Sequence, residues 1–448
     1  MKIIIAGCGK AGYNLASVLF ENNDIIMIDE NKEALERADQ NLDVMCIKGN
    51  CISSKILLEA GVNNCDVLVS VTTRDETNIV CCLTAKNLGA SRVIARIRNY
   101  EYANEIDEMK SDMNLDLVIN PEKKVADEIL KFLKFSKDIK VDFFANKNIE
   151  ILEIKINKKN LMCNLKLKDI IKNDNQNILI AAILRDNFVI VPKGNDVIKE
   201  NDTVYIIAHG NKTINFCQRN KIYVNKLNSV IIVGGGRIGC YLAEYLNNLG
   251  IKTKIFEVDK KRCIFLNDIL PKSVIINGDG MDDKLLKSEN IEDADAFISL
   301  TGRDEENLIS VLLAKNLGAK KVIAKINREH YSRAINSLNL NIDNIINPGM
   351  ITSKYVARYI DNIGDNINNS LINIKKLNVF DFKIDISTSF LNKYIKNLNL
   401  IENVLIAAII RNREIIIPDG ESIVKLGDHL VLISKSENIT DINDIIKL

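Results

Sequence analysis

Two glycine-rich loops are the residues whose types and spacing point most directly to chemistry. They read Gly7-Cys8-Gly9-Lys10-Ala11-Gly12 and Gly234-Gly235-Gly236-Arg237-Ile238-Gly239. Each follows a short β-branched run and opens a segment of helical length. In that setting the first glycine permits a tight turn, the second lets a pyrophosphate approach the backbone, and the third lets helix and strand pack closely. The helix N-terminus then offers free N–H groups to phosphate. The alternative is that the glycines serve only strand-to-helix packing.

An acidic residue and a cation accompany each loop. Asp29 ends the next strand, 17 residues after Gly12, and Glu257 holds the matching position in the second copy. A carboxylate there accepts hydrogen bonds from ribose hydroxyls and repels a 2′-phosphate, so we expect NAD(H) or ATP/ADP rather than NADP. Lys10 and Arg237 occupy the same place in the two loops. Either could reach a terminal phosphate or stay a solvated side chain of the first helical turn.

Further charged residues follow later strands. Arg96 and Arg98 end the expected fifth strand, at the edge of a parallel sheet where ligands bind. Their counterparts are Lys325 and Asn327, so the second copy loses one formal charge and a bidentate donor. Asp75, in the Arg-Asp-Glu run after the fourth strand, is expected to be a first-turn helix acid rather than a ligand contact.

The chain is a duplication. Residues 66–98 and 295–327 match at 18 of 33 positions, which is too many for chance. Nearly the same offset aligns Gly12 with Gly239 and Pro121 with Pro348. A period of half the chain is too long for a solenoid unit, so it marks a duplicated module of two domains.

Each half begins with strands that alternate with helices. In the first half we expect strands at Lys2–Ala6, Ile25–Asp29, Val44–Ile47, Val67–Val71, Val93–Ile97 and Leu117–Ile119, and helices at Lys10–Glu21, Asp75–Leu88 and Glu122–Phe135. This alternation predicts an α/β fold with a parallel sheet covered by helices on both faces.

The pattern then changes to short strands separated by turn residues, which predicts a small α+β domain. The expected strands are Ile178–Leu184, Phe188–Val191 and Thr203–Ile207, repeated at Val404–Ile410, Glu414–Ile417 and His429–Ile433. We therefore expect four domains in alternating order: Rossmann-like domains at 1–138 and 228–364, and α+β domains at 139–222 and 365–448. The polar stretch Asn211–Asn228 is the expected boundary between the halves.

Composition excludes several classes of protein. Across 448 residues, 60 Lys+Arg nearly cancel 59 Asp+Glu, so the basic excess of a nucleic-acid-binding protein is missing. No apolar run approaches the ~20 residues of a membrane helix, and we expect a cytosolic chain. The ten cysteines contain no C-x-x-C pair and lie far in sequence from His209, His330 and His429. We expect no metal site, and reduced cysteines that act as small buried hydrophobic residues.

With this duplicated module, and with the phrases VSVTTRDETN and VIARIR, the chain resembles the TrkA family over essentially its entire length. The resemblance implies a non-enzymatic regulatory subunit of a Trk-type potassium-uptake system, built from tandem RCK (regulator of conductance of potassium) N and C domains. It also implies that NAD(H) or ATP/ADP, bound in the Rossmann cleft, changes the shape of an RCK ring formed by a homodimer or tetramer. The ring would act on a TrkH/TrkG-type membrane subunit from the inner face of the membrane.

The resemblance also assigns residues by position. In the first half the glycines would line the phosphates, Asp29 would hold ribose, Asn50 would lie at the adenine, Arg96 and Arg98 would touch phosphate, and Glu122 would lie near the phosphates or a bound cation. The full set of candidate cofactor-binding residues is Gly7, Gly9, Lys10, Ala11, Gly12, Asp29, Asn50, Cys51, Thr72, Thr73, Arg96, Arg98 and Glu122, with Gly234, Gly236, Arg237, Ile238, Gly239, Glu257, Asp279, Thr301 and Lys325. The second half departs at Gly302, Asn327 and Gly349, which puts equal nucleotide preference at the two sites in doubt.

Two other functions are compatible with this architecture. One is an NAD-dependent dehydrogenase with duplicated Rossmann domains, but no histidine follows a Rossmann strand in a catalytic-looking setting. The other is an RCK regulator of a different cation transporter. Some relatives bind a ligand such as cyclic di-AMP between paired C domains, whereas here a hydrophobic pairing surface is favoured.

Overall fold

The structure is a computed structural model, and the chain divides into two compact units. It describes residues 1–134, 139–144, 149–172, 178–186, 188–209, 216–217, 219–222, 227–328, 331, 340–361, 378–401, 403–411, 414–435, 439 and 441–447. One unit joins Met1–Leu133 with Leu227–Ile360, and the other joins Lys134–Lys226 with Asp361–Leu448. Each unit thus takes one segment from each half of the duplication.

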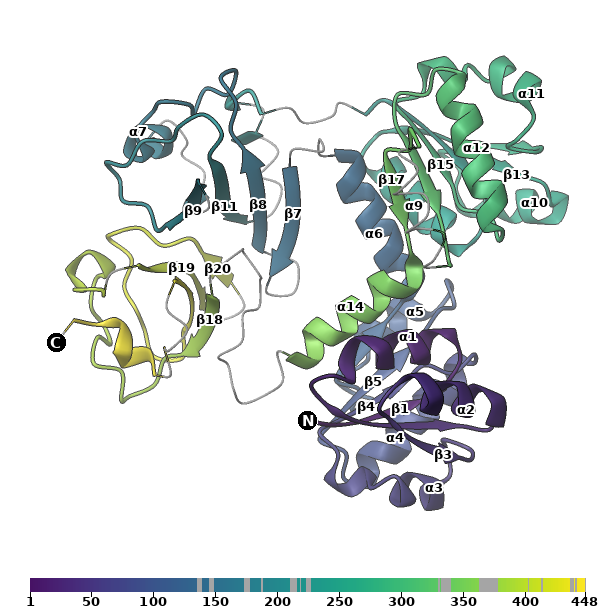
Figure 1. The fold of residues 1–448 in the computed structure, drawn as a ribbon, viewed down its shortest axis with the longest axis horizontal. Coiled ribbons are helices and arrows are strands. Elements are labelled where there is room, and N and C mark those ends of the chain that lie inside the picture. The colour runs from purple at the N-terminus through teal and green to yellow at the C-terminus, as the bar shows by residue number, and fades with distance from the viewer. Residues whose placement is uncertain are drawn as a thin grey trace. The chain divides into compact units, whose positions relative to one another are not determined.

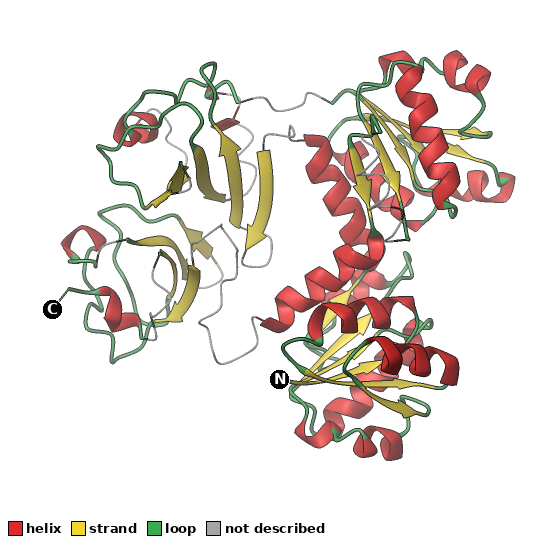
Figure 2. Ribbon diagram, in the orientation of Figure 1, coloured by secondary structure: helices red, strands yellow, loops and turns green. Residues whose placement is uncertain are grey.

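The first unit contains two six-stranded parallel sheets (Figures 1 and 2). The first sheet has the order β3-β2-β1-β4-β5-β6. Its strands are β1 (Lys2–Ala6), β2 (Asp24–Asp29), β3 (Met45–Lys48), β4 (Val67–Ser70), β5 (Arg92–Arg96) and β6 (Leu117–Ile119). Its helices are α1 (Lys10–Leu19), α2 (Lys32–Asn41), α3 (Ser54–Glu59), α4 (Asp75–Asn87), α5 (Ala103–Glu108) and α6 (Pro121–Lys134). Ile3, Ile4 and Ile5 are fully buried, as expected of a strand covered on both faces.

The second sheet repeats this topology with the order β14-β13-β12-β15-β16-β17. Its strands are β12 (Ser229–Val233), β13 (Lys252–Glu257), β14 (Val274–Asn277), β15 (Ala296–Ser299), β16 (Val322–Lys325) and β17 (Asn344–Ile346). Its helices are α9 (Arg237–Asn248), α10 (Lys260–Ile269), α11 (Asp283–Ser288), α12 (Asp304–Asn316) and α14 (Pro348–Asp361). In the first sheet the strand order changes direction between β1 and β4, and in the second it changes between β12 and β15. Sheets of this kind bind ligands at the carboxyl ends of the strands at this point.

The two halves of this unit exchange their last helices. From α6, Val125, Ala126 and Ile129 belong to the same core cluster as β12 and α9 of the second half. In return, α14 reaches the first half (Figure 1). There Tyr359 Oη donates to the Asp116 carbonyl at 3.4 Å. The carboxyl ends of both sheets are therefore held close to the same pair of helices.

The second unit contains two antiparallel sheets, with the orders β10-β9-β11-β8-β7 and β18-β21-β19-β20. The first comprises β7 (Ile139–Phe144), β8 (Ile149–Lys155), β9 (Ile178–Arg185), β10 (Phe188–Ile190) and β11 (Thr203–His209), with helix α7 (Leu167–Lys172). The second comprises β18 (Asn378–Lys383), β19 (Val404–Arg411), β20 (Glu414–Ile416) and β21 (His429–Ser434). Ala181 and Ala182 of β9 share one apolar cluster with Ala407 and Ala408 of β19. This confirms the expected hydrophobic pairing surface between the two α+β domains.

The expected α/β architecture is confirmed, and the six strands expected in the first half are present to within about a residue at each end. Strands β7, β8 and β18 were not expected. Part of the boundary stretch Asn211–Asn228 lies outside the described residues, as do Phe135, His330 and the domain limits at 138 and 364–365. The four domain limits stay a prediction.

Candidate functional site

The two glycine loops have the backbone geometry that the sequence predicts. Gly7 and Gly234 have φ of +105° and +100°, a region that favours glycine. A Cβ on Gly12 would collide with the Gly7 carbonyl oxygen, and a Cβ on Gly239 with that of Gly234. A Cβ on Gly9 or Gly236 would meet nothing within 4 Å. The middle glycine of each loop therefore faces open space at a helix N-terminus, where a phosphate group fits.

The acid after each loop is held by backbone N–H groups. Asp29 Oδ2 accepts from Cys8 N at 2.6 Å and Oδ1 accepts from Asn31 N at 2.8 Å. Glu257 repeats this pattern, accepting from Gly235 N at 2.9 Å and from Asp259 N at 3.0 Å. Each carboxylate oxygen keeps a free lone pair that could accept a ribose hydroxyl.

A buried asparagine fixes the ends of the neighbouring strands. Asn78 of α4 is fully buried, and its Oδ1 accepts from Thr72 N at 2.8 Å and from Ser70 Oγ at 3.0 Å. Its Nδ2 donates to the Arg96 carbonyl at 2.8 Å, which ties β4 to β5. Asn307 makes the equivalent contacts in the second half.

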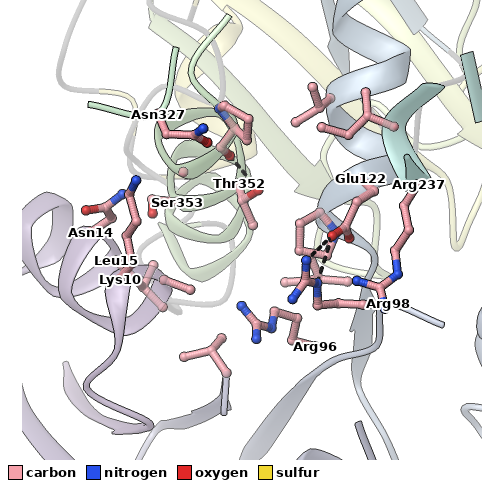
Figure 3. A pocket seen from close by; sticks show the side chains of 18 of the residues that line it. Lys10, Asn14, Leu15, Arg96, Arg98, Glu122, Arg237, Asn327, Thr352 and Ser353 are labelled. Atoms are coloured by element: carbon pink, nitrogen blue, oxygen red, sulfur yellow. Dashed lines mark hydrogen bonds and ion pairs between the residues drawn. The ribbon is translucent and has the colours of Figure 1, made fainter. Parts of the chain in front are cut away.

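Both loops open into one shared cavity of about 360 Å³ (Figure 3). Its lining contains residues from both halves of the first unit. Five lining residues are cationic and one is a carboxylate: Lys10, Arg96, Arg98, Arg237 and Lys325 against Glu122. Such an excess of positive charge favours a polyanionic ligand.

Lys10 and Arg237 reach toward the opposite halves. Neither makes a hydrogen bond or ion pair with the described residues. Burial lowers the pKa of Lys325; the carboxylates of Asp304 and Glu122 oppose this effect, and the charge of Lys10 adds a smaller contribution that lowers it. Burial and the charge of Arg98 also lower the pKa of Arg96; Glu122 and Asp75 oppose this effect, and Arg237 adds a smaller contribution that lowers it. Each loop cation is thus electrostatically coupled to a cation at the strand end of the other half.

Two buried polar atoms of residues that line the cavity lack partners. Arg98 Nε donates to Glu122 Oε1 at 2.7 Å, but the buried Oε2 of Glu122 accepts no hydrogen bond. Arg96 Nη2 donates to the Thr72 carbonyl at 2.6 Å, while its buried Nε has no partner. Because unpaired buried polar groups are costly, these two atoms are places where the wall of the cavity is not satisfied by its own residues.

The structure brings together only part of the predicted set of site residues. Nine of them line the cavity: Lys10, Ala11, Arg96, Arg98, Glu122, Gly236, Arg237, Ile238 and Lys325. The rest lie along the loops and at the strand ends outside it: Gly7, Gly9, Gly12, Asp29, Asn50, Cys51, Thr72, Thr73, Gly234, Gly239, Glu257, Asp279 and Thr301. Asn50 and Asp279 are exposed and accept from the backbone N–H groups of Ile52 and Met281 at 3.0 and 2.9 Å. Cys51 is buried in the core.

Some residues that matter here were not found from the sequence. Asn14, Thr352 and Ser353 line the cavity, and Asn78 positions its strands. The repeated Arg-Asp-Glu-x-Asn run was a signal for Asn78. Asp75 is a buried first-turn residue, as expected, and its Oδ2 accepts from Arg98 N at 2.8 Å.

Other predicted features can be placed as well. All ten cysteines lie among the described residues and none of them forms a disulfide; eight are buried, and Cys46 and Cys163 are partly buried. Within the described residues, no group of three or more candidate ligands could hold a metal ion, and no helix is long and apolar enough to cross a membrane. His209 and His429 lie on β11 and β21, and neither is among the residues that line the cavity.

Comparison with known proteins identifies the family. The TrkA-N domain matches residues 3–121 and 230–348, and the TrkA-C domain matches residues 151–219 and 379–447. The chain belongs to the TrkA family. It is 31% identical to "Trk system potassium uptake protein TrkA homolog 1" of Methanosarcina mazei over the whole of both chains. It is 32% identical to the TrkA protein of Haemophilus influenzae, over 99% of this chain and 98% of that one. TrkA proteins are regulatory proteins rather than enzymes, which rules out the dehydrogenase alternative.

Among solved structures, the fold is similar to a "GsuK channel bound to NAD". The TM-score is 0.63 at 17% sequence identity, with 97% of this chain and 77% of that chain covered. At this identity the match supports the shared fold only, and it agrees with the duplicated RCK architecture expected for the TrkA family.

Proposed function

We propose that this chain is the nucleotide-binding regulatory subunit of a Trk-type potassium-uptake system. The observation that carries the proposal is the cavity shared by the two glycine loops, with five cations from both halves and one carboxylate. Gly9 and Gly236 would hold the phosphates of NAD(H) or ATP/ADP, and Asp29 and Glu257 would hold ribose. Relatives named as TrkA potassium uptake proteins give the transport context.

The arrangement suggests how ligand binding acts on the protein. Lys10 is coupled to Lys325 and Arg237 to Arg96, so phosphate charge in the cavity would attract residues of both halves at once. Ligands with different charge and length would then favour different angles between the halves. A ligand shifts such an equilibrium only if it binds the two arrangements unequally.

The transport step belongs to another chain in this proposal. The partner is an integral membrane subunit of the TrkH/TrkG type, and the regulatory chain lies on the cytoplasmic face of the membrane as a dimeric or tetrameric ring. Regulation of a different cation transporter by the same RCK architecture is the second candidate. Co-purification of the chain with its membrane partner distinguishes the two candidates.

The test is potassium flux through the co-purified complex in lipid vesicles. Flux should change when ATP, ADP or NADH is added, and Gly12→Ala should abolish that response because its Cβ collides with the Gly7 carbonyl. Gly194→Ala is the matched control, since the nearest atom to its Cβ is 3.6 Å away. Flux that ignores all three nucleotides in the wild-type complex contradicts the proposal.

A further inference from the structure

The two Rossmann sheets differ at a pair of positions where the turn after the third strand meets the helix after the fourth. In the first sheet these positions hold Cys51, in the turn after β3, and Cys81, in α4. In the second sheet they hold Gly280 and Ser310. Ser310 Oγ donates to the Gly280 carbonyl at 3.3 Å, so the two positions are in direct contact. The first half therefore has two cysteines where the repeat has a hydrogen-bonded serine and glycine.

A smaller neighbouring residue makes room for the extra side chain in the first half. A Cβ on Gly280 would collide with the side chain of Val233, whereas Ala6 takes the place of Val233 in the first sheet. Cys51 and Cys81 both belong to the buried core cluster of that sheet, and they are 7% and 0% exposed. The cysteine pair thus comes with a matching reduction in volume beside it.

The two thiols are hydrogen-bonded to each other. The Cys81 thiol donates to the sulfur of Cys51, and this contact lowers the pKa of Cys51 although burial opposes it. Cys65 and Cys82 belong to the same core cluster, but burial raises the pKa of both thiols. Because the thiolate is the form that attacks an oxidant, Cys51 is the more reactive member of the pair, and a second thiol is already in contact with it.

The chemistry that fits such a pair is oxidation by a peroxide to a disulfide. The Cys51 thiolate attacks one oxygen of hydrogen peroxide, the O–O bond breaks, and the sulfur becomes a sulfenic acid. The hydroxide that leaves takes up the proton that Cys51 released. The Cys81 thiol then attacks the Cys51 sulfur, the S–O bond breaks, and water leaves with the thiol proton. In total the two thiols lose two electrons, and one hydrogen peroxide is reduced to two waters.

A bond between these sulfurs would act on the acid of the first glycine loop. The turn that contains Cys51 begins at Gly49, whose N donates to the Asp29 carbonyl at 3.0 Å. The Asp29 carboxylate in turn accepts from Cys8 N in the glycine loop at 2.6 Å. In a disulfide the sulfurs lie about 2.05 Å apart, so the turn must move toward α4. That movement would disturb the position of Asp29.

We propose that Cys51 and Cys81 are a peroxide-sensitive pair whose disulfide weakens nucleotide binding at the first glycine loop. The second loop is unaffected, because Gly280 and Ser310 carry no thiol. A small thiol reverses the bond by exchange. The effect on nucleotide binding rests on the proposed function, whereas the formation of the disulfide does not.

The first test identifies the bond in the full chain. The wild type is treated with hydrogen peroxide, its free thiols are blocked with iodoacetamide, and its tryptic peptides are analysed by mass spectrometry. We expect peptides 49–55 and 75–86 to be linked, and dithiothreitol to separate them. Cys81→Ser, which copies the second half, should not form the link. Cys82→Ser is the matched control, because it removes the adjacent and equally buried cysteine from the same peptide and should keep the link.

The second test is calorimetry with ADP before and after oxidation. In the wild type and in Cys82→Ser, peroxide should weaken ADP binding about threefold to tenfold at one class of sites, as expected for one lost hydrogen bond. Cys81→Ser should show no such change, and Cys51→Ser is a second variant with the same expectation. Circular dichroism checks that each variant is folded.

Two kinds of result would overturn the inference. One is the absence of linked peptides in the oxidised wild type, or their presence in Cys81→Ser. The other is an ADP affinity that ignores oxidation in the wild type, or that falls equally in Cys81→Ser. If ADP does not bind the untreated wild type, the proposed function itself fails, and the linked peptides still show whether the disulfide forms.

Discussion

Single residues determine the geometry of the two glycine loops. The three glycines and the acid of each loop could be predicted from sequence because their roles are local: one backbone turn, one open approach and one strand end. The polar character of Asn14 and Ser353 could not be interpreted in that way. Their surroundings are created by a helix from the other half, and no local pattern reports this contact.

The ribose assignment can be tested one half at a time. Asp29→Ala should weaken binding of ADP at the first loop by about 1–3 kcal/mol, because two hydrogen bonds to a charged group are lost. Glu257→Ala should do the same at the second loop. Calorimetry with each variant measures the change, and Glu30→Ala, an exposed neighbouring acid, should have no effect. Unchanged ADP affinity in the double variant Asp29→Ala/Glu257→Ala would show that the ribose lies elsewhere.

The buried lysine of the cavity predicts a pH dependence. Burial holds the pKa of Lys325 below its ordinary value although the carboxylates of Asp304 and Glu122 oppose it, and a bound anion would raise that pKa again. At low pH Lys325 is charged with and without ligand, so this residue adds no pH dependence to the affinity there. As pH rises through the pKa of the free protein, binding must take up a proton and ADP affinity should fall. Calorimetric titrations with ADP from neutral pH to about pH 10 test this prediction. Lys325→Arg should make the ADP affinity nearly independent of pH over that range.

At the scale of elements, the alternation of strand-like and helix-like segments correctly predicted the strands of the first Rossmann sheet. Strands β7 and β8 were missed although both alternate apolar and polar residues over part of their length, which is the signal of a half-buried strand. The packing of α6 on the second half could not be predicted. An amphipathic helix shows which face is buried, but its sequence does not say which sheet covers that face.

The buried Asn78 joins α4 to the strand ends, so we expect its loss to destabilise the fold. Asn78→Ala would leave Thr72 N and the Arg96 carbonyl without partners, so the free energy of unfolding should fall by about 2–4 kcal/mol. Denaturant titration followed by circular dichroism measures the loss. Asn87→Ala, at the exposed end of the same helix, should change stability by less than about 0.5 kcal/mol. Similar stability of the two variants would mean that Asn78 does not hold the strand ends together.

At the scale of the whole molecule, the repeat predicted two copies of a two-domain module. The structure groups the copies crosswise, with both Rossmann segments in one unit and both α+β segments in the other. Sequence similarity reveals duplication, but it carries no information on whether a domain pairs with its neighbour in the chain or with its own repeat. That pairing is what turns two separate glycine loops into one cavity.

The shared cavity makes a prediction that two independent sites would not make. Arg237 belongs to the second loop, but its charge is coupled to Arg96 of the first half. In a Glu257→Ala background, where the second loop has lost its ribose contact, Arg237→Ala should still weaken ATP binding at the first loop by about 1–3 kcal/mol, because a charged hydrogen bond to phosphate is lost. The loss should be smaller for ADP, whose shorter phosphate chain reaches less far across the cavity. Calorimetry with ATP and with ADP, on Glu257→Ala and on Glu257→Ala/Arg237→Ala, gives both losses. Lys272→Ala in the same background removes an exposed cation before β14 and is the control for a simple change of net charge. If Arg237→Ala leaves first-loop affinity for ATP unchanged, the loops act separately, and nucleotide binding cannot change the angle between the halves by the route proposed here.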